Sequence, residues 1–197
     1  MNLETKICQV QSIFSQLDQE IEELKHSSGL DCRSHCTHCC ENPDIEATIL
    51  EFLPLAKHIY DLGWHERYLH QLAAKPEQCI LLNPEQKASQ DISLVPGCRM
   101  YPYRGIICRL FGFSTREDKF GNPELVACSW LKHAPAYANI FLLGIKIPTI
   151  AEYRWQVYGI DPRLCDVMYP INEAIRRAIE IVITYFWYNN PPNSVAS

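Results

Sequence analysis

Four cysteines stand within nine residues near the start of the chain. Residues 32–40 read CRSHCTHCC, and the adjacent pair Cys39 and Cys40 could close a disulfide only as a strained eight-membered ring. The sequence begins without the continuous apolar segment of a secretory signal, so we expect a reducing, cytoplasmic environment. Clustered thiols in such an environment usually bind metal. The spacing therefore predicts a metal site, with a disulfide framework as the less favoured alternative.

Eight of the ten cysteines fall on segments that we expect to be loops. Thiolates from separate loops can converge on an ion, and the binding free energy then holds those loops in place. The predicted metal ligands are Cys32, Cys36, Cys39, Cys40, Cys79, Cys98, Cys108 and Cys128. Cys8 and Cys165 lie in helical segments instead, and we expect them to be small buried hydrophobes or free thiols.

The order of these eight cysteines resembles that of the YkgJ family of cysteine-cluster proteins. The resemblance covers residues 32–128, and its second half reads Cys98-x2-Tyr101-x2-Arg104-x3-Cys108-Arg109-x-Phe111. It implies a domain that chelates zinc or iron, without choosing between them. Relatives usually have proline after the first arginine, where this chain has Gly105. We expect a more permissive turn there, with the thiolate spacing preserved.

Eight thiolates suit two four-coordinate sites. Tetrahedral zinc and iron–sulfur clusters held by four cysteines both satisfy this count, and a polynuclear centre with bridging thiolates is a third arrangement. His35 and His38 are candidates to replace a sulfur at zinc, although histidines among clustered cysteines lie outside the coordination sphere at least as often. The choice among these arrangements stays open.

The predicted site is anionic, because four thiolates around one zinc ion leave about −2 net charge. Arg104 and Arg109 bracket Cys108, where guanidinium groups would offset that charge. Tyr101 can donate a hydrogen bond to a sulfur or pack over the site. We therefore predict that Tyr101, Arg104 and Arg109 support the cofactor; the alternative places both arginines in solvent and Tyr101 in the core.

Three other functions compete with plain metal binding. The spacing C-x3-C-x2-C is also that of radical S-adenosylmethionine enzymes, but the chain is short for their barrel and no alternating strand–helix pattern follows. Some flagellin lysine methylases look related in cysteine pattern, which favours a redox or group-transfer enzyme using an iron–sulfur cluster. The candidate general bases are scattered: His58, His65, His70 and His133. A zinc-stabilised interaction module would need an exposed aromatic patch, for example Tyr153, Trp155 and Tyr158, of which the last two are expected to face inward together.

Two long apolar stripes predict the helices that frame this region. The first predicts an N-terminal amphipathic helix over residues 1–26, ended by Ser27-Ser28-Gly29; its stripe is Leu3, Ile7, Val10, Phe14, Leu17, Ile21 and Leu24. The second predicts a helix from Ile171 to about Tyr188, after a shorter one near 151–158; its stripe is Ile171, Ala174, Ile175, Ala178, Ile179, Val182 and Phe186. Residues 150–188 thus form the C-terminal helices.

Shorter elements are expected between these helices. Asp44 is a plausible N-cap for a helix that Pro54 divides and Gly63 ends, and residues 64–74 predict another. Residues 75–97 read as an irregular connection. The segments 108–113 and 125–130 flank the polar turn TREDKFGNPE, which leaves room for one short β-hairpin. The fold class is therefore mainly α: one domain, 1–197, with helices around a loop-rich region, 32–128, that metal organises.

The overall charge argues against two classes of partner, nucleic acids and anionic membranes. A net charge of −5 and a sequence pI near 5.8 provide no basic surface for nucleic acid or anionic lipid. The most apolar stretch, residues 179–188, is ten residues long and includes Glu180, too short and too charged to span a bilayer. We expect a cytoplasmic metal-binding protein whose partner is a metal ion; the sequence indicates no particular protein partner, and catalysis is left open.

Overall fold

The computed structural model describes residues 1–32, 37, 40–42, 45–83 and 97–189. Its α-helices are α1 (Leu3–Ser28), α2 (Leu53–Asp61), α3 (His65–Ala73), α4 (Ile106–Leu110), α5 (Ser129–Lys132), α6 (Pro135–Asn139), α7 (Ile150–Tyr158) and α8 (Ile171–Asn189). Short 3-10 helices are η2 (Leu50–Phe52), η3 (Tyr101–Tyr103), η4 (Ile140–Leu143) and η5 (Pro162–Leu164). The strands are β1 (Glu46–Ala47), β2 (Leu82–Asn83), β3 (Gly97–Cys98), β4 (Thr115–Glu117), β5 (Pro123–Leu125) and β6 (Tyr169–Pro170).

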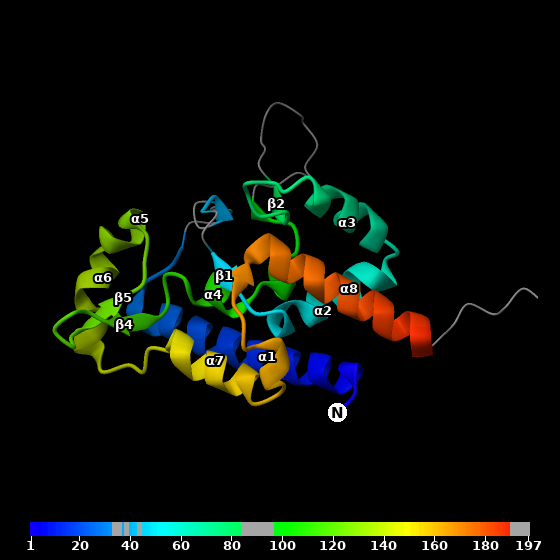
Figure 1. Cartoon of the computed structure of the whole chain (residues 1–197). Helices are drawn as coiled ribbons and strands as arrows, with labels where there is room; N and C mark the ends of the chain where they lie inside the picture. The colour runs from blue at the N-terminus through cyan, green and yellow to red at the C-terminus, as the bar shows by residue number, and fades with distance from the viewer. Residues whose placement is uncertain (33–36, 38–39, 43–44, 84–96, 190–197) are drawn as a thin grey trace, which may run out of the picture.

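The fold is mainly α, as predicted. The described strands form only two-stranded antiparallel pairs, β1–β6, β2–β3 and β4–β5. In Figure 1, α8 lies across α2 and α3, while α1 and α7 run side by side below them. The helices therefore build the core, and the β1–β6 pair joins segments that are distant in the sequence.

Helix α1 forms as the apolar stripe predicts. The Asn2 side chain caps its first turn by accepting a hydrogen bond from the Thr5 N–H at 2.8 Å. Gly29 ends it in the left-handed region at φ 69°, a conformation that glycine adopts without steric cost. All seven predicted stripe residues, from Leu3 to Leu24, are buried. The helix therefore packs along its whole length against the rest of the chain.

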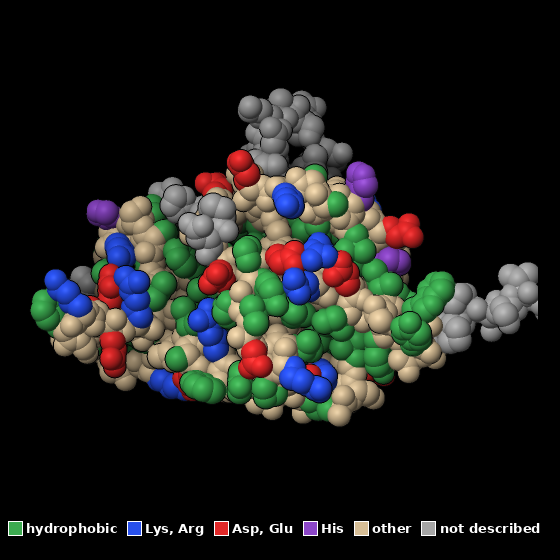
Figure 2. All heavy atoms as spheres, viewed as in Figure 1, with side chains coloured by type: hydrophobic (Ala, Val, Ile, Leu, Met, Phe, Trp, Pro, Cys, Tyr) green, Lys and Arg blue, Asp and Glu red, His purple; other side chains and the backbone are tan. Residues whose placement is uncertain are grey.

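Helix α8 confirms the second stripe. Its seven predicted apolar residues, from Ile171 to Phe186, are the ones that are buried, and they face α2 and α3. Figure 2 shows the opposite face, where acidic and basic side chains alternate. There Glu173 pairs with Arg176 and Arg177, one helical turn away. No helix in the part of the chain that the structure describes is long and apolar enough to cross a membrane.

The predicted start of the second helix is wrong. Residues 46–47 are extended and pair with β6, and α2 begins only at Leu53, with Pro54 in its first turn where no hydrogen-bond donor is needed. Asp44, the expected N-cap, lies outside the described residues. The pairing with a segment more than a hundred residues later satisfies backbone groups that a local helix would otherwise have satisfied. The predicted helix over 64–74 is confirmed by α3.

The predicted hairpin exists, but its strands lie inside the polar segment rather than beside it. Residues 108–110 belong to α4 and residues 129–130 to α5. Strands β4 and β5 are joined by a turn in which the Asp118 carboxylate accepts hydrogen bonds from the Phe120 and Asn122 N–H groups, both at 2.8 Å. These bonds hold the pKa of Asp118 below its usual range. Turn chemistry, rather than the flanking apolar runs, sets the position of this hairpin.

Candidate metal centre

Six of the eight predicted metal ligands belong to the described residues, and all six are half-buried. They are Cys32, Cys40, Cys79, Cys98, Cys108 and Cys128. Cys36 and Cys39 lie outside this part of the chain, as do His35 and His38. Each of the six except Cys40 packs against the apolar core. These five cysteines are thus anchored by the same core.

The β2–β3 pair brings two of these cysteine segments together. Cys98 lies in β3 directly opposite Leu82, and the Leu82 N–H donates to the Cys79 carbonyl at 2.9 Å. A further backbone bond, from Arg99 N–H to the Leu81 carbonyl at 2.9 Å, continues the pairing. Cys79 and Cys98, nineteen residues apart in the sequence, therefore belong to one locally fixed unit.

Asn172, in the first turn of α8, holds the segment around Cys79. Its Oδ1 accepts the Ile80 N–H at 2.8 Å. Its Nδ2 donates to the carbonyls of Pro76 and Gln78, at 3.1 and 2.8 Å. One side chain thus satisfies three backbone groups of an irregular segment that has few partners of its own. Sequence reasoning missed Asn172, because its partners lie more than ninety residues earlier in the chain.

The buried carboxylate of Glu51 anchors the helix that carries Cys108. Its Oε2 accepts the Ile106 N–H at 2.8 Å, at the start of α4. Its Oε1 accepts the N–H and the hydroxyl of Thr48, at 3.0 and 2.9 Å. Burial raises the pKa of Glu51 above its ordinary value, although these hydrogen bonds act in the opposite direction. The carboxylate replaces the capping side chain that Gly105 cannot supply.

Gly105 keeps the backbone that a proline would have. Its φ of −68° lies within the range that a proline ring imposes, so the permissive turn expected from glycine is not used. A Cβ at this position would lie 3.0 Å from Glu51 Oε2 and 3.2 Å from Phe52 Cζ. The missing side chain therefore leaves room for the Glu51 carboxylate at the N-terminus of α4.

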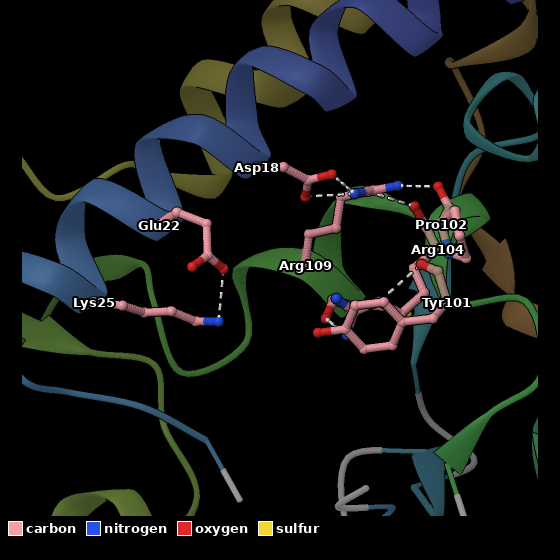
Figure 3. A network of polar contacts seen from close by, with 8 residues as sticks. Asp18, Glu22, Lys25, Tyr101, Pro102, Arg104 and Arg109 are labelled. Carbon is pink, nitrogen blue, oxygen red and sulfur yellow. Dashed lines mark hydrogen bonds and ion pairs between the residues drawn. The ribbon is translucent and has the colours of Figure 1, made fainter. Parts of the chain in front are cut away.

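Arg109 ties the cysteine region to α1. Its side chain is only 2% exposed, and its guanidinium pairs with the Asp18 carboxylate, as Figure 3 shows. The same group donates to the carbonyls of Pro102 and Arg104 and lies 4.4 Å from the centre of the Phe14 ring. These contacts exclude the alternative of a solvated Arg109. Its predicted role beside thiolates stays a prediction.

Arg104 and Tyr101 form a stacked pair on the surface. The Arg104 guanidinium lies 3.4 Å from the centre of the Tyr101 ring and donates to the carbonyls of Tyr101 and Cys108, at 3.3 and 3.4 Å. Tyr101 is 57% exposed, so the alternative that placed it in the core is wrong. The contact with the Cys108 carbonyl places the positive charge of Arg104 beside the backbone of a predicted ligand.

The two cysteines left out of the ligand set differ in exposure. Cys8 is exposed, while Cys165 is half-buried, and burial raises the pKa of the Cys165 thiol to about 12. A thiol with that pKa stays protonated near neutral pH in the absence of a metal ion. Both observations agree with the expectation of free or packed thiols.

The expectation that Trp155 and Tyr158 face inward is wrong. Trp155 is 70% and Tyr158 37% exposed, and their rings meet edge to face at 5.5 Å between centres. Only Tyr153 of that trio is buried. The apolar residues of α7 are not concentrated on one face, so the sequence gives no strong signal for its buried face. Contacts with α1 and α4 decide which face is buried.

The donor set fits a thiophilic metal. Zinc and iron both accept cysteine thiolates, and the described sulfurs sit on segments that backbone hydrogen bonds and the core hold in place. Within the described ranges, no three His, Cys, Asp or Glu side chains form a group that could hold a metal ion. Since Cys36 and Cys39 lie outside those ranges, the complete ligand set stays a prediction.

Comparison with known proteins identifies the cysteine region. The family model CxxCxxCC, described as a "Putative zinc- or iron-chelating domain", matches residues 31–129, half of the 197-residue chain. The comparisons with curated proteins and with solved structures gave no match. The match begins one residue before Cys32 and ends one residue after Cys128, so it encloses the predicted ligand set. The chain belongs to the CxxCxxCC family of zinc- or iron-chelating domains, the family that includes the YkgJ-type cysteine-cluster proteins.

Proposed function

We propose that this protein binds zinc or iron through eight thiolates arranged as two four-coordinate sites or as iron–sulfur clusters. The proposed ligands are Cys32, Cys36, Cys39, Cys40, Cys79, Cys98, Cys108 and Cys128. The observation that carries the proposal is that five of them, spread from residue 32 to residue 128, pack as half-buried side chains against one core. Bound metal would then link loops that have little regular structure of their own.

Charge and anchoring support this proposal. Arg104 contacts the Cys108 backbone, and Asn172 and Glu51 hold the segments of Cys79 and Cys108 through backbone hydrogen bonds. Positions fixed in this way reduce the ordering that metal binding would otherwise require. Tyr101, Arg104 and Arg109 are proposed to stabilise the anionic site rather than to bind the metal themselves. A reducing compartment such as the cytoplasm suits this thiolate chemistry.

Metal analysis of protein purified without oxygen tests the proposal. Iron with acid-labile sulfide and a broad absorption band near ~400 nm would indicate iron–sulfur clusters. Stoichiometric zinc without visible absorption would indicate tetrahedral thiolate sites. Protein that is folded by circular dichroism yet takes up neither metal would contradict the proposal.

A pair of serine variants tests the ligand assignment. We expect Cys108→Ser to lower bound metal and thermal stability together, because a lost ligand also releases its segment. Cys165→Ser is the matched control and should leave the metal content unchanged, since its thiol is protonated and outside the set. Equal metal content in both variants would remove Cys108 from the set.

A further inference from the structure

A cavity of about 450 Å³ opens beside the cysteine region, between α2, α3 and the residues that follow β3. Its lining includes His58 from α2, Trp64 just before α3, Tyr68 within α3, and Met100 after β3. The volume is in the range that accommodates small-molecule ligands. None of these four residues belongs to the predicted metal ligands, so the cavity is a separate feature of the fold.

The cavity wall offers an apolar, aromatic surface. All three lining residues Trp64, Tyr68 and Met100 are apolar or aromatic; Tyr68 and Met100 are buried, whereas Trp64 is 42% exposed. His58 is held in place by stacking on Tyr103, with 4.5 Å between ring centres. An exposed indole beside a buried aromatic floor provides the flat contact that an aromatic or planar ligand requires.

Two arginines from different elements also line the cavity. Arg67 belongs to α3 and Arg99 follows β3, and both are exposed. Within the described part of the chain, neither forms an ion pair with a carboxylate. Five other arginines do form such pairs: Arg109, Arg116, Arg163, Arg176 and Arg177. The cavity lining thus includes two guanidinium groups that have no carboxylate partner among the described residues.

The positive charges of Arg67 and Arg99 act on Tyr68, a buried residue of the cavity lining. Burial raises the pKa of Tyr68, while the nearby charges of Arg99 and Arg67 act to lower it and that of Cys98 adds to the rise. Arg99 directly follows Cys98 in the chain, so this part of the lining adjoins a predicted metal ligand.

We propose that this cavity binds a small organic anion, a carboxylate or phosphate ester with a flat apolar body. The body packs against Trp64 and Met100, and the anionic group is held by Arg67 and Arg99. His58 and Gln71 add polar contacts at the edge. A ligand in this position lies beside the segment of Cys98, so the pocket is placed to present a substrate or effector to the cysteine region.

Calorimetric titration of the protein tests the pocket with three probes that share a phenyl ring and a linker of similar length: 3-phenylpropionate, benzyl phosphate and the uncharged 3-phenylpropan-1-ol. We expect one site per chain for the preferred anion. The alcohol should bind at least about tenfold more weakly than this anion, because it cannot form charge-assisted hydrogen bonds. Comparison of the two anions identifies the preferred head group. Equal affinity for the alcohol and both anions, or no binding of any probe, would overturn the proposal.

Arg67→Gln and Arg116→Gln form a matched pair of variants. Arg67→Gln should weaken anion binding about tenfold and leave the alcohol unchanged. Arg116→Gln, an exposed arginine of the hairpin, should change neither. Equal anion affinity in Arg67→Gln and the unchanged protein would overturn the proposal. Metal content is measured in the same samples. If the purified protein contains no metal but still binds the anion through Arg67, the result would contradict the proposed metal function and support the proposed pocket.

Discussion

The two long helices and the cysteine region are stabilised in different ways. Helices α1 and α8 each bury a continuous apolar stripe of seven residues. In the cysteine region, the described elements between Leu82 and Lys132 are two to five residues long. Single polar side chains hold the segments there: Glu51 at α4, Arg109 between α4 and α1, and Asn172 around Cys79. The helices thus depend on buried area, and the cysteine region on a few long-range polar contacts.

This difference predicts that substitutions can destabilise the two regions separately. Changes in the stripes should lower the global free energy of unfolding, whereas changes in the polar anchors should act first on the geometry around the cysteines. The following substitutions test that distinction in order of decreasing expected effect.

The largest effect is expected for Ile175→Ala in the fully buried face of α8. Loss of three side-chain carbons leaves a cavity and should lower the free energy of unfolding by about 2–5 kcal/mol. Urea denaturation followed by circular dichroism measures this change. Arg176→Ala, on the exposed face of the same helix, is the control and should cost under about 1 kcal/mol. Equal losses in the two variants would contradict the assignment of the buried face.

Arg109→Met should lower the free energy of unfolding by about 2 kcal/mol. The change leaves the carbonyls of Pro102 and Arg104 and the Asp18 carboxylate without their donor, although Asp18 is half exposed and water can partly replace it. Arg109→Lys should recover only part of the loss, because an ammonium group cannot reproduce the forked geometry. Thermal unfolding measures both. Full recovery with lysine would show that charge alone matters here.

Asn172→Ala should have a smaller global effect, about 1–2 kcal/mol, and a larger local one. Three backbone groups around Cys79 lose their partner, so the thiol of Cys79 should react faster with an alkylating reagent in metal-free protein. Mass spectrometry of labelled peptides measures the rate. Asn189→Ala, which removes one bond at the exposed end of α8, is the control. An unchanged Cys79 rate would contradict the anchoring role of Asn172.

The smallest effect is expected for the change in stability that follows protonation of Glu173 in acid. Arg176 and Arg177 lower the pKa of Glu173 from 4.5 to about 2. Because the folded pKa lies below the unfolded one, the stabilisation is present above about pH 4.5 and is lost as the pH falls toward 2. We expect under about 1 kcal/mol for this partly exposed cluster. Glu173→Gln should flatten that part of the stability-versus-pH curve; an equally steep curve would show that other carboxylates account for it.

Local sequence patterns predicted the long helices well and the central elements poorly. The stripes from Leu3 to Leu24 and from Ile171 to Phe186 match the buried residues, because seven apolar side chains at helical spacing have only one way to be buried together. The helix expected after Asp44 fails, since β1 pairs with a strand that lies far away in the sequence. The inward position of Trp155 fails as well, because short α7 buries Tyr153 and Val157 instead.

The sequence by itself determined the amphipathic helices, the helical class and the match of residues 31–129 to a family of zinc- or iron-chelating domains. These features depend on spacing within short stretches, where the geometry of the backbone relates sequence to structure directly. The tertiary structure alone decided that Glu51, Asn172 and Asp18 anchor the cysteine region and that Arg67 and Arg99 share a cavity. Such contacts join residues tens of positions apart, so they exist only once the helices have packed and no local pattern encodes them.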